Sequence, residues 1–470
     1  MKTMNKTKLV PGLALSFAVM LWVSLTGQAA QAADNPQWFR GQLHAHTYWS
    51  DGRGFPEQAV EAYKQRGYQF LCITDHNLFA ENKEIWREVA EKEGSWPPTV
   101  TQAIFDNYVQ TFGKEWVESK TENKTNGPVT SVRLKTHTEV KAKFEEPGKF
   151  ILLPGVELTQ TVHGLGLHLN YVNLPWILPC IKGAGMIKTV EEGKTMSEMI
   201  ALNSSEVEKV TIKRQRPFML TLNHPFWVYY DVAPQILIDR PEIRFFEVCN
   251  GGSDHAPHPQ APNYTCEKYW DIVNAFRRIQ GHPLLYGIGT DDAHFYDAQR
   301  TKGICGVGDA WVMVRAADLT PKHLLAAMHK GDFYASSGVF LEEAAFIPAD
   351  NTLRVKVKVE PGVHYRIDFI TTKQGFDRTR TEMACPAENG RPARTIPIYS
   401  DDIGRIVKTV EGTEAAYRLE ADDLYVRARV ESDSPSKFES HFHPKVKMAW
   451  TQPYAAKGTS SEKTSGDEPR

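Results

Sequence analysis

Short apolar runs that end in histidines or carboxylates are the feature that most constrains the fold of this 470-residue chain. The clearest runs lie at 70–74, 149–153, 218–222, 243–249, 284–289 and 310–314. Continuous apolar runs of this length, mostly bounded by Gly, Pro or Asn, are typical of parallel strands covered on both faces. Helix signals lie between several of them, at 56–67, 269–281 and 320–331. The alternation predicts an α/β fold, either a barrel or a wound sheet.

The polar residues at the ends of these runs form an ordered set of motifs. In chain order they are H-A-H at 44–46, S-D-G at 50–52, T-D-H-N at 74–77, G-V-E at 155–157, N-H-P at 223–225 and D-D-A-H at 291–294. Strand ends are where an α/β barrel builds its active site. Histidine with Asp and Glu, without thiolates, suits zinc, manganese or iron, and shared carboxylates suit more than one ion. The set predicts a metal-dependent hydrolase.

The order of these motifs resembles that of the PHP (polymerase and histidinol phosphatase) family of metal-dependent phosphoesterases. The resemblance runs from Gly41 to about Gly338, roughly two-thirds of the chain. Its most specific parts are the H-x-H-x4-D opening, the T-D-H-N and the D-A-H ending. It implies a distorted (β/α)7 TIM-like barrel that holds two or three divalent transition ions, either Zn, Mn or Fe.

Two histidines separated by one residue open the motif set. In an extended strand His44 and His46 point to the same side, so they could hold one ion together. Asp51 follows on a turn, where an isolated aspartate would be an ordinary turn residue. Asp75 precedes His76 just past a strand and could orient a ligand.

Two positions have a neighbouring rival. His163 competes with His168, which the resemblance favours by its spacing from Glu157, and Asp291 competes with Asp292, which D-x-H pairing favours. The resemblance makes Glu157 the bridging carboxylate. It implies three ligand groups: His44, His46, Glu157 and Asp292; Glu157, His168 and His224; and Asp51, His76 and His294.

Catalytic and substrate-binding roles follow from the same set. Phosphoester hydrolysis could use a hydroxide between two ions held by Glu157, with His224 or His294 protonating the leaving group. Arg53 could hold a phosphate oxygen or merely solvate its turn. Glu247 and Asn250 end a strand beside the expected site, where they could bind substrate or cap the strand.

The N-terminal segment 1–32 is expected to be a cleaved signal peptide. Three lysines precede an apolar stretch at 9–25, and Ala30-Gln31-Ala32 offers a cleavage site. We therefore expect a periplasmic or secreted protein with no membrane span after cleavage. Without those lysines the chain is more acidic than basic, which excludes the basic footprint expected for duplex nucleic acid.

Four segments follow from the composition. Residues 35–340 are expected to form the barrel, with polar insertions at 81–147, of helical spacing, and 174–216, without strand signals. The insertions could be walls that select substrate or plain surface helices. Period-two alternation predicts a sandwich-like antiparallel β domain at 341–452. Residues 453–470 are expected to be a disordered tail.

The expected substrate is a small-molecule phosphate ester. Amide or lactone hydrolysis, as in amidohydrolases, and a non-catalytic extracellular binding protein are the alternatives. Cys72 and Cys249 are expected to be buried. Pairing of the other four cysteines, Cys180, Cys266, Cys305 and Cys385, is left open, as are the oligomeric state and the exact ester.

Overall fold

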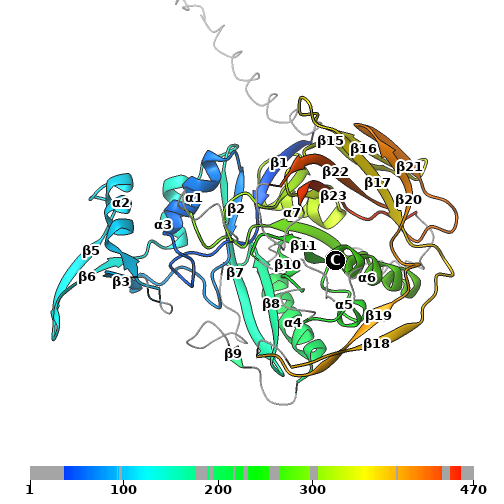
Figure 1. Ribbon diagram of the computed structural model, residues 1–470. Coiled ribbons are helices and arrows are strands. Elements are labelled where there is room, and N and C mark those ends of the chain that lie inside the picture. Colours follow the sequence, from blue (N-terminus) through cyan, green and yellow to red (C-terminus); the bar gives the residue numbers. More distant parts are fainter. Residues whose placement is uncertain are drawn as a thin grey trace, which may run out of the picture.

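The computed structural model describes residues 36–92, 94, 98–175, 188–189, 194–214, 217–225, 231–252, 265–296, 305–387, 390–436 and 445–456 (Figure 1). The expected signal peptide and the last part of the expected tail lie outside these residues. In the described part, no helix is both long and apolar enough to cross a membrane.

A mixed sheet of 14 strands forms the centre of the molecule. The strands of its first part, in order across the sheet, are β12 (Tyr286–Thr290), β11 (Phe245–Asn250), β10 (Met219–Leu222), β8 (Leu165–Val172), β7 (Ile151–Val162), β2 (Phe70–Ile73), β1 (Gln37–Gln42), β13 (Trp311–Ala316) and β14 (Phe333–Ser336). β1, β2 and β7 run parallel, and so do β10, β11 and β12. The α/β class and strands at all six apolar runs are confirmed, but β13, expected to be parallel, pairs antiparallel with β1 and β14.

The sheet departs from a regular βα repeat at β8. This strand forms a hairpin with β7 and pairs antiparallel with both β7 and β10. β12 comes close to β13, since a Cβ at Gly289 would lie 2.8 Å from the Trp311 carbonyl oxygen. No ladder joins these two strands within the described ranges, so the closed (β/α)7 barrel stays a prediction.

Three helices form where the sequence signals place them, although the second begins three residues before its signal at 269. They are α1 (Pro56–Gln65), α6 (Cys266–Gln280) and α7 (Pro321–Lys330). The Thr320 hydroxyl accepts the His323 N–H at the start of α7, and Gly331 ends it with a left-handed φ of 81°. The short helix α5 (Pro234–Ile238) packs beside α6.

The first insertion is a small α/β unit rather than a set of helices. It contains β3 (Trp86–Ala90), β4 (Val100–Thr101), α2 (Gln102–Phe112), β5 (Ser119–Lys124), β6 (Gly127–Arg133) and α3 (His137–Phe144). The strand order β4-β3-β6-β5 makes a sheet that projects from the side carrying α1 (Figure 1). The helical spacing of 81–147 therefore predicts α2 and α3 but not the four strands of this insertion. The second insertion holds β9 (Lys188–Thr189) and α4 (Met196–Arg214).

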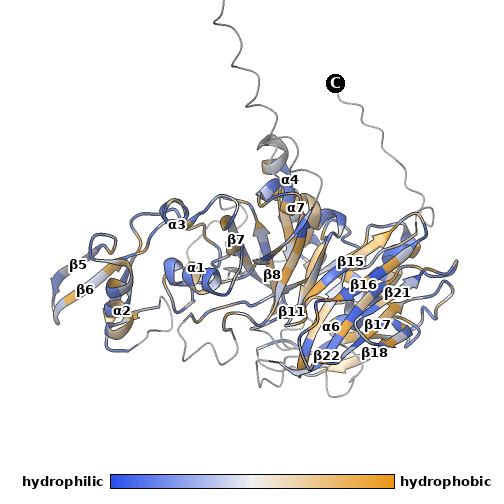
Figure 2. Ribbon diagram, turned by 90° about the horizontal axis from the view of Figure 1, so that it is seen from above, coloured by the Kyte–Doolittle hydropathy of each residue, from blue (hydrophilic) through white to orange (hydrophobic). Residues whose placement is uncertain are grey.

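The C-terminal segment is antiparallel throughout, as its alternation predicts. β15 (Leu341–Ile347), β16 (Thr352–Val357) and β21 (Glu414–Arg418) form one sheet, and β18 (Arg380–Cys385) pairs with β19 (Arg394–Tyr399). β23 (Val446–Thr451), β22 (Arg427–Pro435), β17 (Tyr365–Thr371) and β20 (Arg405–Glu411) extend the central sheet through β14. Blue and orange alternate along β16 and β17 in Figure 2.

The chain remains folded beyond the point where the tail is expected to begin. Tyr454 bridges Val426, stacks on Phe346 at 5.2 Å and donates its hydroxyl to the Gly331 carbonyl. The start of the expected tail at 453 is therefore too early.

Candidate metal centre

The expected ligands come together at one end of the central sheet. His44 and His46 follow β1, His76 follows β2, and His224 follows β10. Asp292 and His294 follow β12, whereas Glu157 and His168 lie within β7 and β8. Since these strands are neighbours in the sheet, side chains distant in the sequence converge on a single cluster.

Four donor atoms form the tightest part of this cluster. Nε2 of His44 and Nε2 of His46 lie 3.1 Å apart, and each lies 3.1 or 3.2 Å from Oε2 of Glu157 and from Oδ1 of Asp292. Donors at zinc-ligand distances from a tetrahedral ion lie roughly 3.3–3.6 Å from one another. The spacing therefore fits a single ion held by these four residues.

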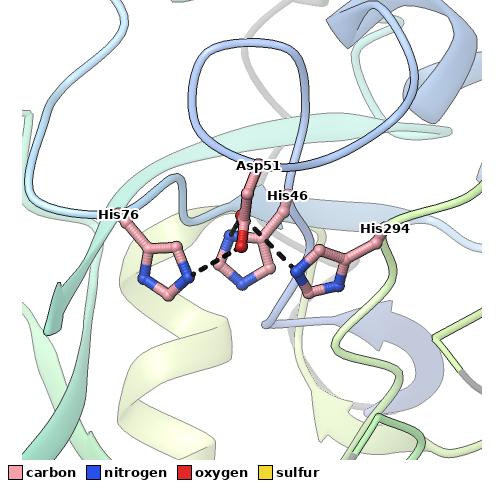
Figure 3. Close-up of side chains that lie close together, drawn as sticks. All are labelled: His46, Asp51, His76 and His294. Atoms are coloured by element: carbon pink, nitrogen blue, oxygen red, sulfur yellow. Dashed lines mark ion pairs between the residues drawn. The ribbon is translucent and has the colours of Figure 1, made fainter. Parts of the chain in front are cut away.

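Asp51 organises a second group of donors. Figure 3 shows its carboxylate pointing between the rings of His46, His76 and His294. Its oxygens lie 3.7, 3.6 and 3.4 Å from nitrogens of these rings, in that order. The turn that carries Asp51 needs glycine next to it, because a Cβ at Gly52 would lie 2.3 Å from the His46 carbonyl oxygen.

Glu157 lies between the groups and uses its two oxygens separately. Oε2 is 3.1 Å from Nδ1 of His76, in addition to its contacts with Nε2 of His44 and of His46. Oε1 is 2.9 Å from Nδ1 of His168 and 3.6 Å from Nε2 of His224, and it accepts a hydrogen bond from the Asn223 amide. A carboxylate that faces different imidazoles with each oxygen is suited to bridging two ions.

The three groups differ from those that the resemblance implies, because His46 joins the Asp51 group and His76 takes the place of His224 beside Glu157 and His168. His76 lies with Glu157 and His168 as well as with Asp51 and His294, because its two nitrogens face opposite ways. Glu157, expected to end a strand, continues it, because its backbone pairs with Asn170 of β8.

Both rivalries between neighbouring residues are decided by burial and contacts. His168 is buried beside Glu157, whereas His163 is exposed at the tip of the β7–β8 hairpin. Asp291 accepts three backbone N–H groups of residues 308–310 and the Tyr63 hydroxyl. It therefore holds the following loop, and Asp292 takes the place in the cluster.

A set of buried side chains orients the ligands. Glu247 Oε1 lies 2.7 Å from Nδ1 of His44, and its other oxygen accepts from the His224 backbone and the Asn250 amide. Neither Glu247 nor Asn250 is exposed, so we now interpret both as positioning residues instead of the substrate-binding residues that the sequence predicts. The Thr159 hydroxyl, 2.5 Å from Nδ1 of His76, was not anticipated.

The charges of the centre are mutually dependent. Burial alone would raise the pKa of the Glu157 carboxyl, but the imidazoles of His76 and His44 hold that pKa well below its ordinary value. Burial also opposes protonation of His46, yet hydrogen bonds to Asp292 and Glu157 raise its pKa to about 9. The carboxylates therefore demand positive charge, which protons or metal cations can supply, and metal binding would release the protons.

Comparisons with known proteins give limited similarity. No family model matches the chain. A 40-residue stretch is 42% identical to part of the DNA polymerase/3'-5' exonuclease PolX of Bacillus subtilis (strain 168), covering 8% of this chain and 7% of that protein. The chain thus matches only a small fraction of the length of this curated relative.

Solved structures overlap more of the chain at low identity. A two-domain protein from Bacteroides vulgatus ATCC 8482, containing a predicted PHP-like metal-dependent phosphoesterase, is 14% identical with a TM-score of 0.36, covering 85% of this chain and 91% of its own. An amidohydrolase from Chromobacterium violaceum, with bound sulfate, is 12% identical with a TM-score of 0.25, covering 54% and 87%. Overlaps this low do not establish a common fold.

Proposed function

We propose that this protein is an exported, metal-dependent phosphoesterase of the PHP type, with a barrel closed between β12 and β13. The observation that carries the proposal is the position of Glu157, whose two oxygens face two sets of imidazoles at 2.9–3.6 Å. A structural site would close one ion into four ligands. Donors spread over so many strand ends favour a reactive centre with two or three ions, either Zn, Mn or Fe.

Different residues would contribute to different parts of the hydrolysis. Bound ions would supply the Lewis acidity that lowers the pKa of water and neutralises a phosphoryl group. The Glu247 carboxylate holds Nδ1 of His44 and so directs Nε2 into the cluster. Arg53, whose backbone N–H donates to the His294 carbonyl, would supply a guanidinium for a phosphate oxygen.

Proton donation to the leaving group falls to His294 rather than His224. The His294 side chain is 20% exposed, against 7% for His224, so it can reach a substrate. Burial lowers the pKa of His294, but Asp51 outweighs it and holds that pKa well above its ordinary value. Its Nε2 faces Asp51 and could give a proton to an alkoxide only with no ion in the Asp51 group, because an ion there would take the same nitrogen.

The test compares bond types and matched variants. Mature protein beginning after Ala32 is loaded with Mn²⁺ or Zn²⁺ and given an aryl phosphate, an aryl ester and an aryl amide. We expect hydrolysis of the phosphate alone, abolished by chelation and restored by either ion. His168→Ala should lose most activity, whereas His163→Ala, five residues earlier on the same hairpin, should keep it. Ester or amide hydrolysis without phosphatase activity would overturn the proposal in favour of an amidohydrolase.

A further inference from the structure

A groove runs between α1 and α2, beside the candidate metal centre. Its volume is ≈ 600 Å³, within the range of about 300–1,000 Å³ that small-molecule sites occupy. One face of α1 and one face of α2 line it, so the first insertion supplies a whole wall. We refer to it as the α1–α2 groove.

One part of this groove lies next to the chain segments that carry Asp51 and His294, the two most exposed side chains of the centre. Arg53 and Tyr296 line it there. The Arg53 N–H donates to the His294 carbonyl at 2.6 Å, and the Tyr296 hydroxyl donates to the His46 carbonyl at 2.6 Å. The side chains of Asp51 and His294 are 22% and 20% exposed. A phosphoryl group at this face would direct its organic part into the groove.

Buried contacts hold the wall in place. The Tyr108 hydroxyl and Trp116 indole both donate to Oε1 of Glu57 at 2.7 Å, and Glu57 itself is fully buried on α1. The ring of Phe55 stacks on Tyr108 at 3.7 Å. α2 is thus tied to the start of α1 without any ligand, which is what a largely pre-formed binding site requires.

The lining favours a leaving group with both polar and apolar faces. Gln58 of α1 donates to Asn107 of α2, Gln65 and Glu61 of α1 add an amide and a carboxylate, and Ile104 and Phe112 offer apolar surface. Arg66 lies near the far end of α1, about 15 Å from its start at 1.5 Å per residue. The volume and length exceed what a phosphate or a methyl ester could fill.

We propose that the α1–α2 groove binds the organic leaving group of the phosphoester and selects extended, hydrogen-bonding alcohols of nucleoside or sugar size. This inference rests on the proposed function for its catalytic consequence. The insertion at 81–147 would then be a specificity wall rather than a solvated surface feature.

The test fills the groove from α2. Ala103 is exposed and lines the groove, whereas Gln110 is exposed on another face of the same helix. Relative to wild type and Gln110→Trp, Ala103→Trp should lower kcat/KM about tenfold or more for a nucleoside monophosphate or a hexose phosphate. Hydrolysis of p-nitrophenyl phosphate and the metal content should stay unchanged. The two arms show which of the two alcohols is preferred.

Direct binding separates this inference from the proposed function. Adenosine and methyl glucoside are titrated calorimetrically into metal-loaded wild-type protein and both variants. Binding that Ala103→Trp alone removes supports the groove, even if no phosphate ester is hydrolysed and the proposed function therefore fails. Hydrolysis of p-nitrophenyl phosphate with no binding of either alcohol, and equal kcat/KM in all three proteins, overturns the groove and leaves the function standing. No binding and no hydrolysis overturns both.

Discussion

Replacing Arg427 with Met should destabilise the whole chain rather than the C-terminal segment alone. The Arg427 side chain is 1% exposed and donates to both oxygens of Asp271 at 2.9 and 2.7 Å and to Glu267 at 2.8 Å. Both acids belong to α6 and Arg427 belongs to β22. These ion pairs therefore join the α/β part of the chain to the C-terminal segment. Without the guanidinium, Asp271 would keep a hydrogen bond from the Tyr425 hydroxyl and the attraction of Lys268, but no ion pair.

The expected loss follows from burial. Breaking a buried ion pair by removing one partner costs about 3–5 kcal/mol, because an uncompensated charge stays buried. Chemical unfolding followed by intrinsic tryptophan fluorescence would measure it, and Trp270, one of the 11 tryptophans, lies 5.0 Å from the guanidinium carbon. Met keeps the length and apolar stem of Arg, so the loss reports charge and hydrogen bonds rather than an empty volume.

Two further variants make this measurement decisive. Arg380→Met removes the exposed pair with Glu382, so it should cost only about 0–1 kcal/mol. Adding Asp271→Leu to Arg427→Met should recover much of the stability, since the unpaired charge is then gone. A loss below 1 kcal/mol, or a first unfolding transition confined to 341–452, would refute the reasoning and support the independent folding that the change in sequence pattern predicts.

Three other outcomes are expected. Mature protein should retain two to three transition ions per chain by elemental analysis, and Glu157→Gln should lower that number more than His168→Ala does; equal losses would contradict a bridging role. His46→Ala should lower turnover of the best phosphate ester by orders of magnitude with an unchanged circular dichroism spectrum, and wild-type rates would exclude a metal-dependent mechanism. Arg391→Ala should lower metal retention without shifting the unfolding midpoint of the central sheet, because its guanidinium holds Asp231, which follows β10 in the chain, at 2.6 Å. Unchanged metal retention would show that the C-terminal segment does not contribute to the metal centre.

The alternation of apolar runs predicted the strands well but missed the β7–β8 hairpin. His163 and Gly164 both have positive φ, at 50° and 79°, and join Val162 to Leu165 in a two-residue turn. Gly164 is a turn signal of the kind found in tight hairpins. The G-V-E motif was interpreted as a strand end, so the continuation of the strand through Glu157 was overlooked.

The ligands could be predicted because their residue types and their order can be recognised in the sequence itself. Their orienting partners were not, because these contacts join distant segments. Glu247 lies 203 residues from His44, and no local pattern distinguishes it from a residue that caps a strand. Thr159 is likewise an ordinary strand residue until β7 is placed beside His76.

The contacts of the T-D-H-N motif at 74–77 explain why the spacing of the sequence motifs predicts the metal centre. Thr74 pairs with the backbone of Ala45, which keeps the end of β2 in register with the segment that holds His44 and His46. Asp75 accepts the Ser50 hydroxyl and backbone N–H, and thereby fixes the turn that carries Asp51. Thr74 thus aligns the segment that carries His44 and His46, and Asp75 fixes the position of Asp51 on its turn.

Asn77 completes the motif from the other side. Its backbone is left-handed, with φ of 54°, a conformation that asparagine tolerates better than most residues. Its amide group bonds both the N–H and the carbonyl of Thr159 at 3.0 Å, in the manner of a neighbouring strand. Thr159 in turn contacts Nδ1 of His76. A change at Thr74, Asp75 or Asn77 would therefore displace a ligand that it does not itself supply.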